Sequence, residues 1–491
     1  MESKEDQVPL QETIYKPISQ DTTPTTLKPE TSESTSWFVY FAASVANLVA
    51  FAIGIAFGWP SPVLPKLSGK VDPDNNPLGR PATHSEESWI AGLAALGGIF
   101  GPLIVGVLVD KIGRKRTLLL LVLPMVTSLL AQAFAKTVLI FYITRFLIGV
   151  GAGGSLTVLP IYLAEIAETH NRGTLGCLLG IFISLGLLFT FSVGPFLTIR
   201  NFCLLCSVPL IIFMVVFSLW IPETPQFLAS TNKNRELEIT LTKLRNKTPS
   251  EIQKEVVEIT NAVLEESRNK GNFTDLFKRK GLRKGIIVIL GTIILQQFAG
   301  INAVLAYMQT IFDAAGNGLA PEISTIIIGV IQTLATVATG FLVERLGRRL
   351  LLLASALGSS VSLIALGLFF HLKTNGFNVE TVSWLPVASL IAYIVAFNIG
   401  LGPLPWAVMA ELFPPNVKSA ASTITSVVCF TGAFIITLFF PSIALLLGMA
   451  KSFWIFAVVC FGGTIFIYYV LPETKGRSLQ EIQRLLEGNK T

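Results

Sequence analysis

Three amide side chains lie close together in one otherwise apolar stretch of the sequence. Gln296, Gln297 and Asn302 fall within the run 285–311. A carboxamide presents a donor and an acceptor without carrying a charge, so a group of amides suits a neutral ligand rich in hydroxyl groups. On a straight helix Asn302 would point about 140° away from Gln297, and a break at Gly300 would bring the three together. The alternative is that these amides only bridge helices within a bundle.

The other reactive side chains predict no catalysis. His84, His170 and His371 stand in loops or at the ends of apolar runs without partner ligands, and no nucleophile lies beside a base. The pattern GxGxxG occurs at 149–154, but no strand precedes it and it lies inside an apolar run, where small residues let helices approach closely. We therefore expect no enzymatic activity, no cofactor and no metal site.

The composition indicates which elements position these side chains. The 491 residues are 52% hydrophobic and 14% charged, whereas a soluble protein carries about 25% charged residues. So few charges cannot coat a soluble protein of this length. The net charge of +6 lies mostly in short loops between apolar runs, which argues for a lipid bilayer and against a nucleic-acid partner.

Twelve apolar runs are predicted to be membrane helices, because a span needs about 20 residues. Six precede and six follow a polar stretch, near residues 37–59, 89–109, 117–135, 137–163, 173–199 and 201–221, and then 285–311, 322–343, 350–371, 382–410, 419–447 and 452–471.

The runs divide the chain into five parts. These are a disordered N-terminal tail (1–36), a six-helix half (37–221), a helical linker domain (222–284), a second six-helix half (285–471) and a C-terminal tail (472–491). An even number of spans puts both termini on one side, and that side carries most of the basic loop residues. The positive-inside rule then makes both tails and the linker cytoplasmic. We expect a multi-pass monomer in the plasma membrane, with an internal vesicle membrane as the alternative.

The two halves repeat each other. Asp110–Arg116 matches Glu344–Arg349, Pro222–Pro225 matches Pro472–Lys475, and the pair Glu165 and Arg172 matches Glu411 and Lys418. The copies lie 234, 250 and 246 residues apart, in the same order. Two six-helix halves related by an axis along the membrane normal are typical of transporters.

These motifs resemble the sugar porter family of the major facilitator superfamily. The resemblance spans residues from about 37 to 485 and also rests on Arg145–Gly149, Pro160–Ala167, Gln296–Asn302, Pro403–Trp406 and Pro472–Ser478. Within that family the chain is most similar to the insect trehalose and glucose facilitators. The resemblance implies an all-α membrane protein with the major facilitator fold, which moves a sugar by alternating access.

The resemblance also implies which residues bind the sugar. They are Gln296, Gln297, Asn302, Gln332 in the eighth span and Trp406 on a broken tenth span, whose ring would stack on the sugar. Four positions depart from the pattern of glucose porters, which predicts a wider or altered pocket and leaves trehalose, glucose or another sugar open. Gly180 replaces a glutamine, Asn398 a glutamate, and Cys429-Phe430 an Asn-Trp pair.

A cytoplasmic gate is implied in the same way, by charged side chains at helix ends. In the family such pairs hold the two halves together on the inner side. The matching residues are Arg114, Glu165, Arg172, Glu223, Glu344, Arg348 and Glu411. Gln226 and Lys418 replace arginines of the family pattern, so we expect a looser gate.

The absence of acidic residues from the spans favours uniport. None of the twelve runs carries Asp or Glu within its hydrocarbon portion, and proton relays through membranes need such a group. Ala56 stands where the family's symporters are expected to carry an aspartate. The sequence thus predicts facilitated diffusion of trehalose or of a hexose such as glucose. The alternatives are a proton-coupled sugar symporter and a membrane sugar sensor that does not transport.

Overall fold

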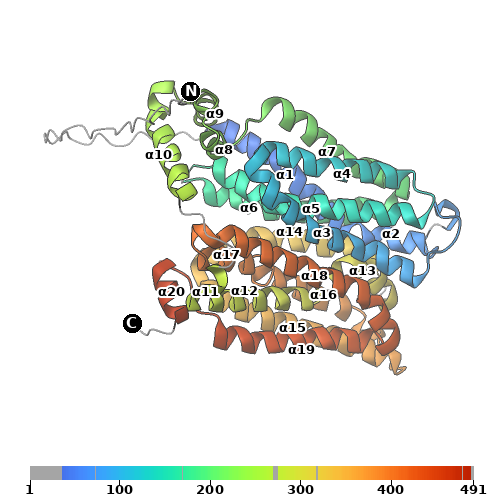
Figure 1. Cartoon of the computed structure of the whole chain (residues 1–491). Helices are drawn as coiled ribbons and strands as arrows, with labels where there is room; N and C mark the ends of the chain where they lie inside the picture. Colours follow the sequence, from blue (N-terminus) through green and yellow to red (C-terminus); the bar gives the residue numbers. More distant parts are fainter. Residues whose placement is uncertain are drawn as a thin grey trace, which may run out of the picture. The chain divides into compact units, whose positions relative to one another are not determined.

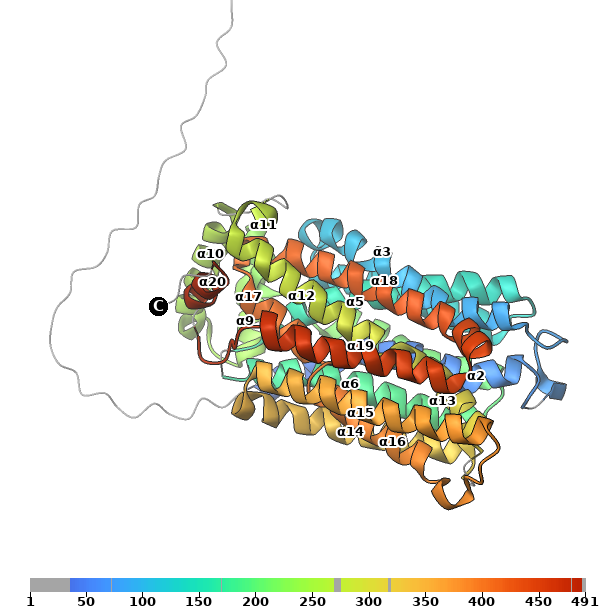
Figure 2. The ribbon, with the colours of Figure 1, turned by 90° about the horizontal axis from the view of Figure 1, so that it is seen from below.

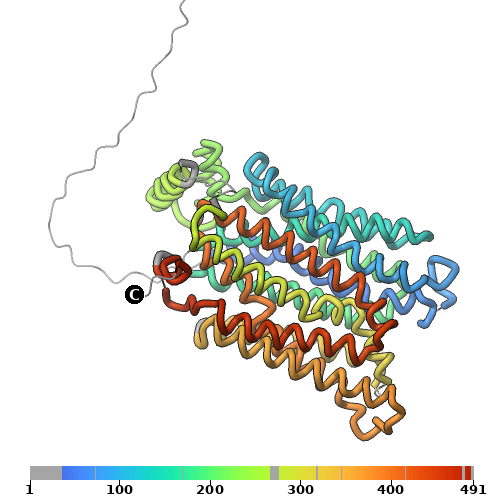
Figure 3. Tube along the Cα trace, turned by 60° about the horizontal axis from the view of Figure 1, so that its bottom comes forward, coloured from blue at the N-terminus to red at the C-terminus, as the bar shows by residue number. Residues whose placement is uncertain are grey.

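The computed structural model describes residues 36–71, 73–168, 170–268, 275–316, 319–477 and 479–487. Within these ranges the protein contains helices and no strands, and twelve of its helical segments are long and apolar enough to cross a membrane. The predicted all-α class and the number of spans are therefore confirmed. Figure 3 shows the first six spans (blue to green) lying together and the last six (yellow to red) lying together.

The first half contains six spans built from seven helices (Figure 1). They are α1 (Trp37–Gly58) with α2 (Pro60–Leu67), α3 (His84–Ile112), α4 (Arg114–Ala133), α5 (Val138–Ile166), α6 (Arg172–Val193) and α7 (Ile199–Trp220). Short 3-10 turns, η1 (Pro73–Asn75) and η2 (Gly194–Phe196), lie in its loops.

The second half repeats this plan with two divided spans. Its helices are α12 (Lys280–Phe298) with α13 (Ile301–Ala315), α14 (Pro321–Leu346), α15 (Arg348–Thr374), α16 (Leu385–Ile399) with α17 (Leu404–Leu412), α18 (Pro415–Leu447) and α19 (Met449–Val470). The turn η3 (Glu380–Val382) precedes α16, and α20 (Leu479–Glu487) follows the last span.

Three spans are interrupted. The seventh breaks at Gly300, whose φ of 91° ends α12 and begins α13, as the sequence predicted. The tenth breaks between Ile399 and Leu404. The first continues past its predicted end at residue 59, because Pro60 occupies the first position of α2, where a missing N–H costs no hydrogen bond.

The glycine of the first repeated motif allows α4 to begin close to another loop. Gly113 has a φ of 91°, and a Cβ there would lie only 2.3 Å from Oε2 of Glu223. The Glu223 carboxylate accepts hydrogen bonds from the backbone N–H groups of Arg114 at 3.1 Å and Lys115 at 3.0 Å. An anion at a helix N-terminus satisfies the free N–H groups and the positive end of the helix dipole.

The second half builds the same cap. Gly347 has a φ of 87°, and the Glu473 carboxylate accepts from the backbone N–H groups of Arg348 at 3.0 Å and Arg349 at 3.1 Å. Partial burial opposes ionisation of Glu473, but hydrogen bonds from four backbone N–H groups hold its pKa below the usual value. In each half, therefore, the glutamate of one repeated motif caps the helix that begins at the other repeated motif.

The halves meet along two helix pairs and at one end. Helix α3 packs on α18, and α6 packs on α14 (Figure 2). At the end of the bundle away from α20, α2 packs on α13, where the backbone N–H of Gln309 donates to Oγ of Ser61 at 3.2 Å.

The described residues of the segment between the halves form four helices. They are α8 (Pro225–Ser230), α9 (Asn234–Arg245), α10 (Pro249–Arg268) and α11 (Asp275–Lys278). Helices α8 to α10 share a small core of their own, made by Leu228, Ala229, Leu237, Leu241 and Ile252. They lie at the same end of the bundle as the start of α1 and as α20 (Figure 1).

One arginine joins this group of helices to the membrane helices. Arg245 is 5% exposed, and its guanidinium donates to the Glu255 carboxylate at 2.8 Å and to the carbonyl of Ile166, the last residue of α5, at 2.9 Å. The contact connects α9, α10 and α5, so it holds the small core against the first half.

We expect the variant Arg245→Met to loosen α8–α10, because it removes the hydrogen bonds to the Glu255 carboxylate and to the Ile166 carbonyl, and hydrogen bonds of charged groups are worth about 1.5–3 kcal/mol. Limited proteolysis of the purified protein should show faster cleavage within 222–268, with the membrane helices intact. Lys233→Met is the matched control, since the Lys233–Glu236 pair is exposed and worth about 0–1 kcal/mol. Equal cleavage of the two variants would contradict this role.

Candidate functional site

The break at Gly300 brings the three amides of the seventh span into one chain of hydrogen bonds. Asn302 Nδ2 donates to Gln297 Oε1 at 2.5 Å, and Gln297 Nε2 donates to Gln296 Oε1 at 3.0 Å. The two glutamines lie in the last turn of α12 and are buried, whereas Asn302 lies in the first turn of α13 and is half-buried. A straight helix would have separated these side chains, so the left-handed glycine is what groups them.

Gln296 also connects the two broken spans of the second half. Its Nε2 donates at 2.7 Å to the carbonyls of both Leu401 and Gly402, in the break between α16 and α17. In return, the Tyr393 hydroxyl of α16 donates to the carbonyl of Ala299 at 3.0 Å. Gln296 therefore bridges helices, which was the alternative to sugar binding, because its amide nitrogen is already hydrogen-bonded. Asn302 lies at the partly exposed end of the three hydrogen-bonded amides.

The other two predicted binding residues lie on neighbouring helices. Gln332 on α14 is 6% exposed, and its Oε1 is buried without a hydrogen-bond partner in the described structure. A buried acceptor without a partner costs about 1–3 kcal/mol, so it is suited to receive a ligand hydroxyl. Trp406 lies on α17, directly after the tenth-span break, and is half-buried.

Gly180 lies at the contact between the halves. A Cβ at Gly180 would be 3.3 Å from Cγ2 of Thr336 on α14. One turn further along α6, the hydroxyls of Ser184 and Thr336 are hydrogen-bonded at 2.8 Å, and Thr336 also approaches Oδ1 of Asn398 at 3.4 Å. Two of the four departures thus belong to one polar contact between α6, α14 and α16, which sequence reasoning did not identify.

The other two departures lie side by side on α18. Gln297 Nε2 donates to Cys429 Sγ at 3.1 Å, so the thiol belongs to the amide cluster. Phe430 packs against α3 of the first half, because a Cβ at Gly98 would lie 2.4 Å from its ring. Both contacts join residues far apart in sequence, so no local pattern of the sequence indicates them.

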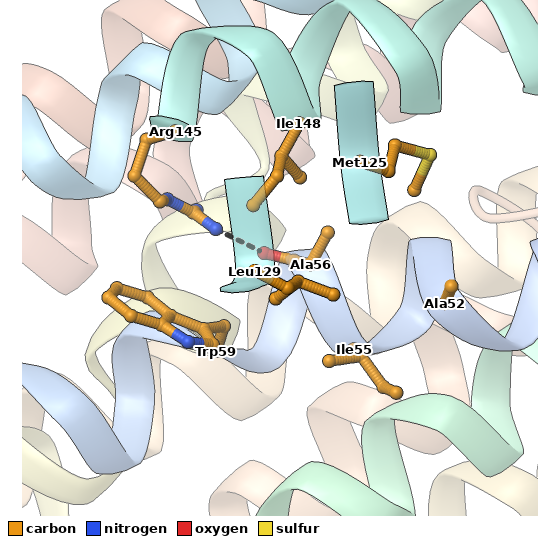
Figure 4. A pocket seen from close by; sticks show the side chains of 8 residues that line it. All are labelled: Ala52, Ile55, Ala56, Trp59, Met125, Leu129, Arg145 and Ile148. Carbon is orange, nitrogen blue, oxygen red and sulfur yellow. Dashed lines mark hydrogen bonds between the residues drawn. The ribbon is translucent and has the colours of Figure 1, made fainter. Parts of the chain in front are cut away.

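Arg145 is a charged residue within the apolar run 137–163, and the structure buries its side chain among helices of the first half. It donates to the carbonyls of Ile90 at 3.0 Å and Ala56 at 3.1 Å, and its guanidinium lies over the ring of Trp59 at 5.0 Å (Figure 4). Three spans are tied together by this one side chain. Its hydrogen-bonding partners in the described residues are backbone carbonyls.

The charged residues at the helix ends on the side of α20 pair within each half. Arg114 contacts Glu165 at 2.9 Å, and Arg348 contacts Glu411 at 2.9 Å. The resemblance implied pairs between the halves, and these two pairs do not cross. Arg172 is exposed at the start of α6, and the side chain of Glu344 lies outside the described residues.

The protein has two repeated six-helix halves, with a polar cluster at broken helices in the middle of the second half. This arrangement is typical of secondary membrane transporters. Comparison with known proteins agrees. A family profile described as "Sugar (and other) transporter" matches residues 32–486. The facilitated trehalose transporters Tret1 of Polypedilum vanderplanki and Bombyx mori are each 32% identical to this chain, covering 94% and 96% of it and 90% and 91% of their own lengths.

Solved structures show the same fold. The xylose transporter XylE from E. coli, in a partially occluded inward-open conformation, aligns with a TM-score of 0.73 and 24% identity over 90% of this chain and 100% of that chain. The proton:xylose symporter XylE bound to 6-bromo-6-deoxy-D-glucose aligns with a TM-score of 0.71 over 92% of this chain. The chain belongs to the sugar transporter family, and its function is membrane transport rather than catalysis.

We expect Gly300→Ala to destabilise the protein, because the site depends on the left-handed backbone at this position. The φ of 91° costs a residue with a Cβ about 1–2 kcal/mol, and that Cβ would lie 2.5 Å from the ring of Phe456. The thermal unfolding midpoint of the purified protein should fall further than in Gly376→Ala. Gly376 shares a positive φ but has nothing within 4 Å of the added Cβ, so equal shifts would contradict the steric part of the argument.

Proposed function

We propose that this protein is a facilitative transporter of trehalose or of a hexose such as glucose, working by alternating access. The observation that carries the proposal is the amide chain Gln296–Gln297–Asn302 at the Gly300 break. The names of its relatives, facilitated trehalose transporters, support the substrate class and the absence of coupling.

The polar atoms of the proposed binding residues suit a weakly bound neutral sugar. Asn302 is partly accessible, and Gln332 offers a buried acceptor without a partner. Each hydrogen bond contributes about 1 kcal/mol net, and a millimolar dissociation constant corresponds to only about −4 kcal/mol. A few amides and stacking on Trp406 are therefore sufficient for binding and permit rapid release.

The surroundings of Arg145 support uniport. A proton-coupled carrier needs an ionisable acid facing its pathway, and the partners of the Arg145 guanidinium in the described residues are carbonyls and an aromatic ring. The carbonyl of Ala56 occupies the place nearest the guanidinium in the first span (Figure 4). A carbonyl cannot carry a proton through a transport cycle.

We further propose that the termini and residues 222–284 lie in the cytoplasm, and that the protein functions as a monomer in the plasma membrane. Basic residues of the short loops concentrate on this side, as the positive-inside rule requires for cytoplasmic loops.

Uptake of radiolabelled trehalose and glucose into oocytes tests the proposed function. We expect saturable uptake of at least one sugar, unchanged by a protonophore. Gln297→Ala should raise KM by about tenfold or more, because two or more hydrogen bonds of the cluster are lost. Gln253→Ala is the matched control, since Gln253 is exposed on α10. Loss of uptake with the protonophore would indicate a symporter, and no uptake by protein present at the surface would indicate a sensor.

We propose that the charged residues of the inner side form a gate when that side closes. The repeat places Arg172 and Lys418 at equivalent positions of the two halves, and both are exposed and without an ion pair in the described structure. In the closed state each would reach across to the acid of the other half, Arg172 to Glu411 and Lys418 to Glu165. The pairs Arg114–Glu165 and Arg348–Glu411 hold these acids in place.

Arg172→Gln and Lys418→Gln should each slow uptake, by up to about fivefold, because exposed ion pairs are worth about 0–1 kcal/mol. The KM for the sugar should change little, since neither residue belongs to the amide cluster. Arg283→Gln serves as the control, being an exposed cation at the same end of the bundle. Initial rates at equal surface expression give the answer, and an equal effect of the control would argue against specific pairing.

A further inference from the structure

A groove on the surface of the first half lies between the inner ends of α4 and α7. It has a volume of about 390 Å³ and is lined by Ile112, Arg116, Leu119, Leu120, Leu123 and Met214. Arg116 and Leu123 are two turns apart on α4, about 10 Å along the helix, which is about a third of the thickness of a bilayer's hydrocarbon core. Leu120 and Leu123 are about half exposed, at 51% and 47%. Five apolar side chains and one cation at the end are the lining that a lipid chain with an anionic headgroup requires.

The internal repeat shows that Arg116 is not needed for the fold. Lys115 and its counterpart Arg349 make the same contact, since each donates to a carbonyl in the last turn of the sixth or twelfth span, Ser218 or Tyr468. The next residue is Arg116 in the first half and Leu350 in the second, and both are exposed. The structure gives the Arg116 guanidinium no hydrogen bond or ion pair within the residues it describes.

Two further cations lie at the end of the groove. The Lys115 ammonium donates to the carbonyl of Ser218 at 2.9 Å, and the Lys243 ammonium donates to the carbonyl of Trp220 at 2.8 Å. Ser218 lies one turn beyond Met214 of the groove. The neighbouring acid Glu223 directs its carboxylate to the backbone N–H groups that begin α4, so its charge is used there. Positive charge therefore accumulates where the apolar groove reaches the membrane surface.

We propose that this groove is a binding site for an anionic phospholipid of the leaflet on the side of α20. One acyl chain lies along Leu119, Leu120 and Leu123, and the phosphate contacts Arg116, with Lys115 and Lys243 beside it. The apolar length of the groove selects a lipid over a free anion, and the three cations select an anionic headgroup over a zwitterionic one.

The test uses the purified full chain in detergent, titrated with palmitoyl-oleoyl phosphatidylserine or the matching phosphatidylcholine, with bound lipid counted by native mass spectrometry. We expect phosphatidylserine to bind more tightly. Arg116→Leu should weaken its first binding step by about fivefold, the factor for one basic residue at an anionic surface, and Arg116→Lys should retain most of the affinity. Leucine is the residue of the equivalent position in the second half, so this variant should keep its thermal unfolding midpoint.

Two variants separate the groove from general charge. Lys136→Leu removes an exposed cation from the loop at the other end of α4 and should leave phosphatidylserine binding unchanged. Leu120→Trp fills the groove without changing charge and should weaken binding. The proposal is overturned if Arg116→Leu binds like the unmodified protein, if Lys136→Leu weakens binding equally, or if Leu120→Trp has no effect. Displacement by glycerophosphoserine, the headgroup without chains, would also overturn it by showing a free-anion site.

Discussion

The structure depends on one constraint: within a bilayer, every backbone N–H and carbonyl must find a partner inside the protein. Unbroken helices meet it unaided, but a binding site in the middle of the membrane needs polar groups that a regular helix does not present. The second half breaks two spans and lets each supply the other, because Gln296 donates to the break in the tenth span and Tyr393 donates to the break in the seventh. The side chains of the candidate site thus also supply the hydrogen bonds that the two interrupted helices lack.

The two halves share the same helix arrangement and the same helix cap, and they differ in their buried polar side chains. In each half, the third of its six spans begins after a glycine of positive φ. A glutamate that follows the last span of the same half caps that helix. The first half then ties its spans with the buried Arg145, whereas the second carries the amides. The duplication therefore separates a half whose spans are tied by a buried cation from a half that carries the amide cluster.

Much of this architecture is predictable from sequence, because apolar length and repeated motifs are local signals. The twelve spans follow from them, and the glycine between the amides of the seventh span indicated the break at Gly300. Contacts between distant segments do not: nothing local indicates that Gly180 faces Thr336, that Cys429 accepts from Gln297, or that Arg114 and Arg348 pair within their own halves. Pro60 at the start of α2 can end one helix or begin another, and the sequence alone does not decide between them. The packing of α2 on α13 favours a continuing helix.

The threonines at the contact between α6 and α14 bear on how easily the halves can move. Thr336 bonds to Ser184 across the contact, but its hydroxyl also donates to the Gln332 carbonyl one turn earlier on its own helix at 2.9 Å. Thr333 likewise donates to the Gly329 carbonyl at 2.9 Å. When the helices slide, the two threonine hydroxyls each keep a partner on their own helix, and the Ser184 hydroxyl gives up its bond to Thr336. Such a contact holds the two helices together at rest and loses few hydrogen bonds when they move. This property suits a reversible rocking of the two halves inside a membrane.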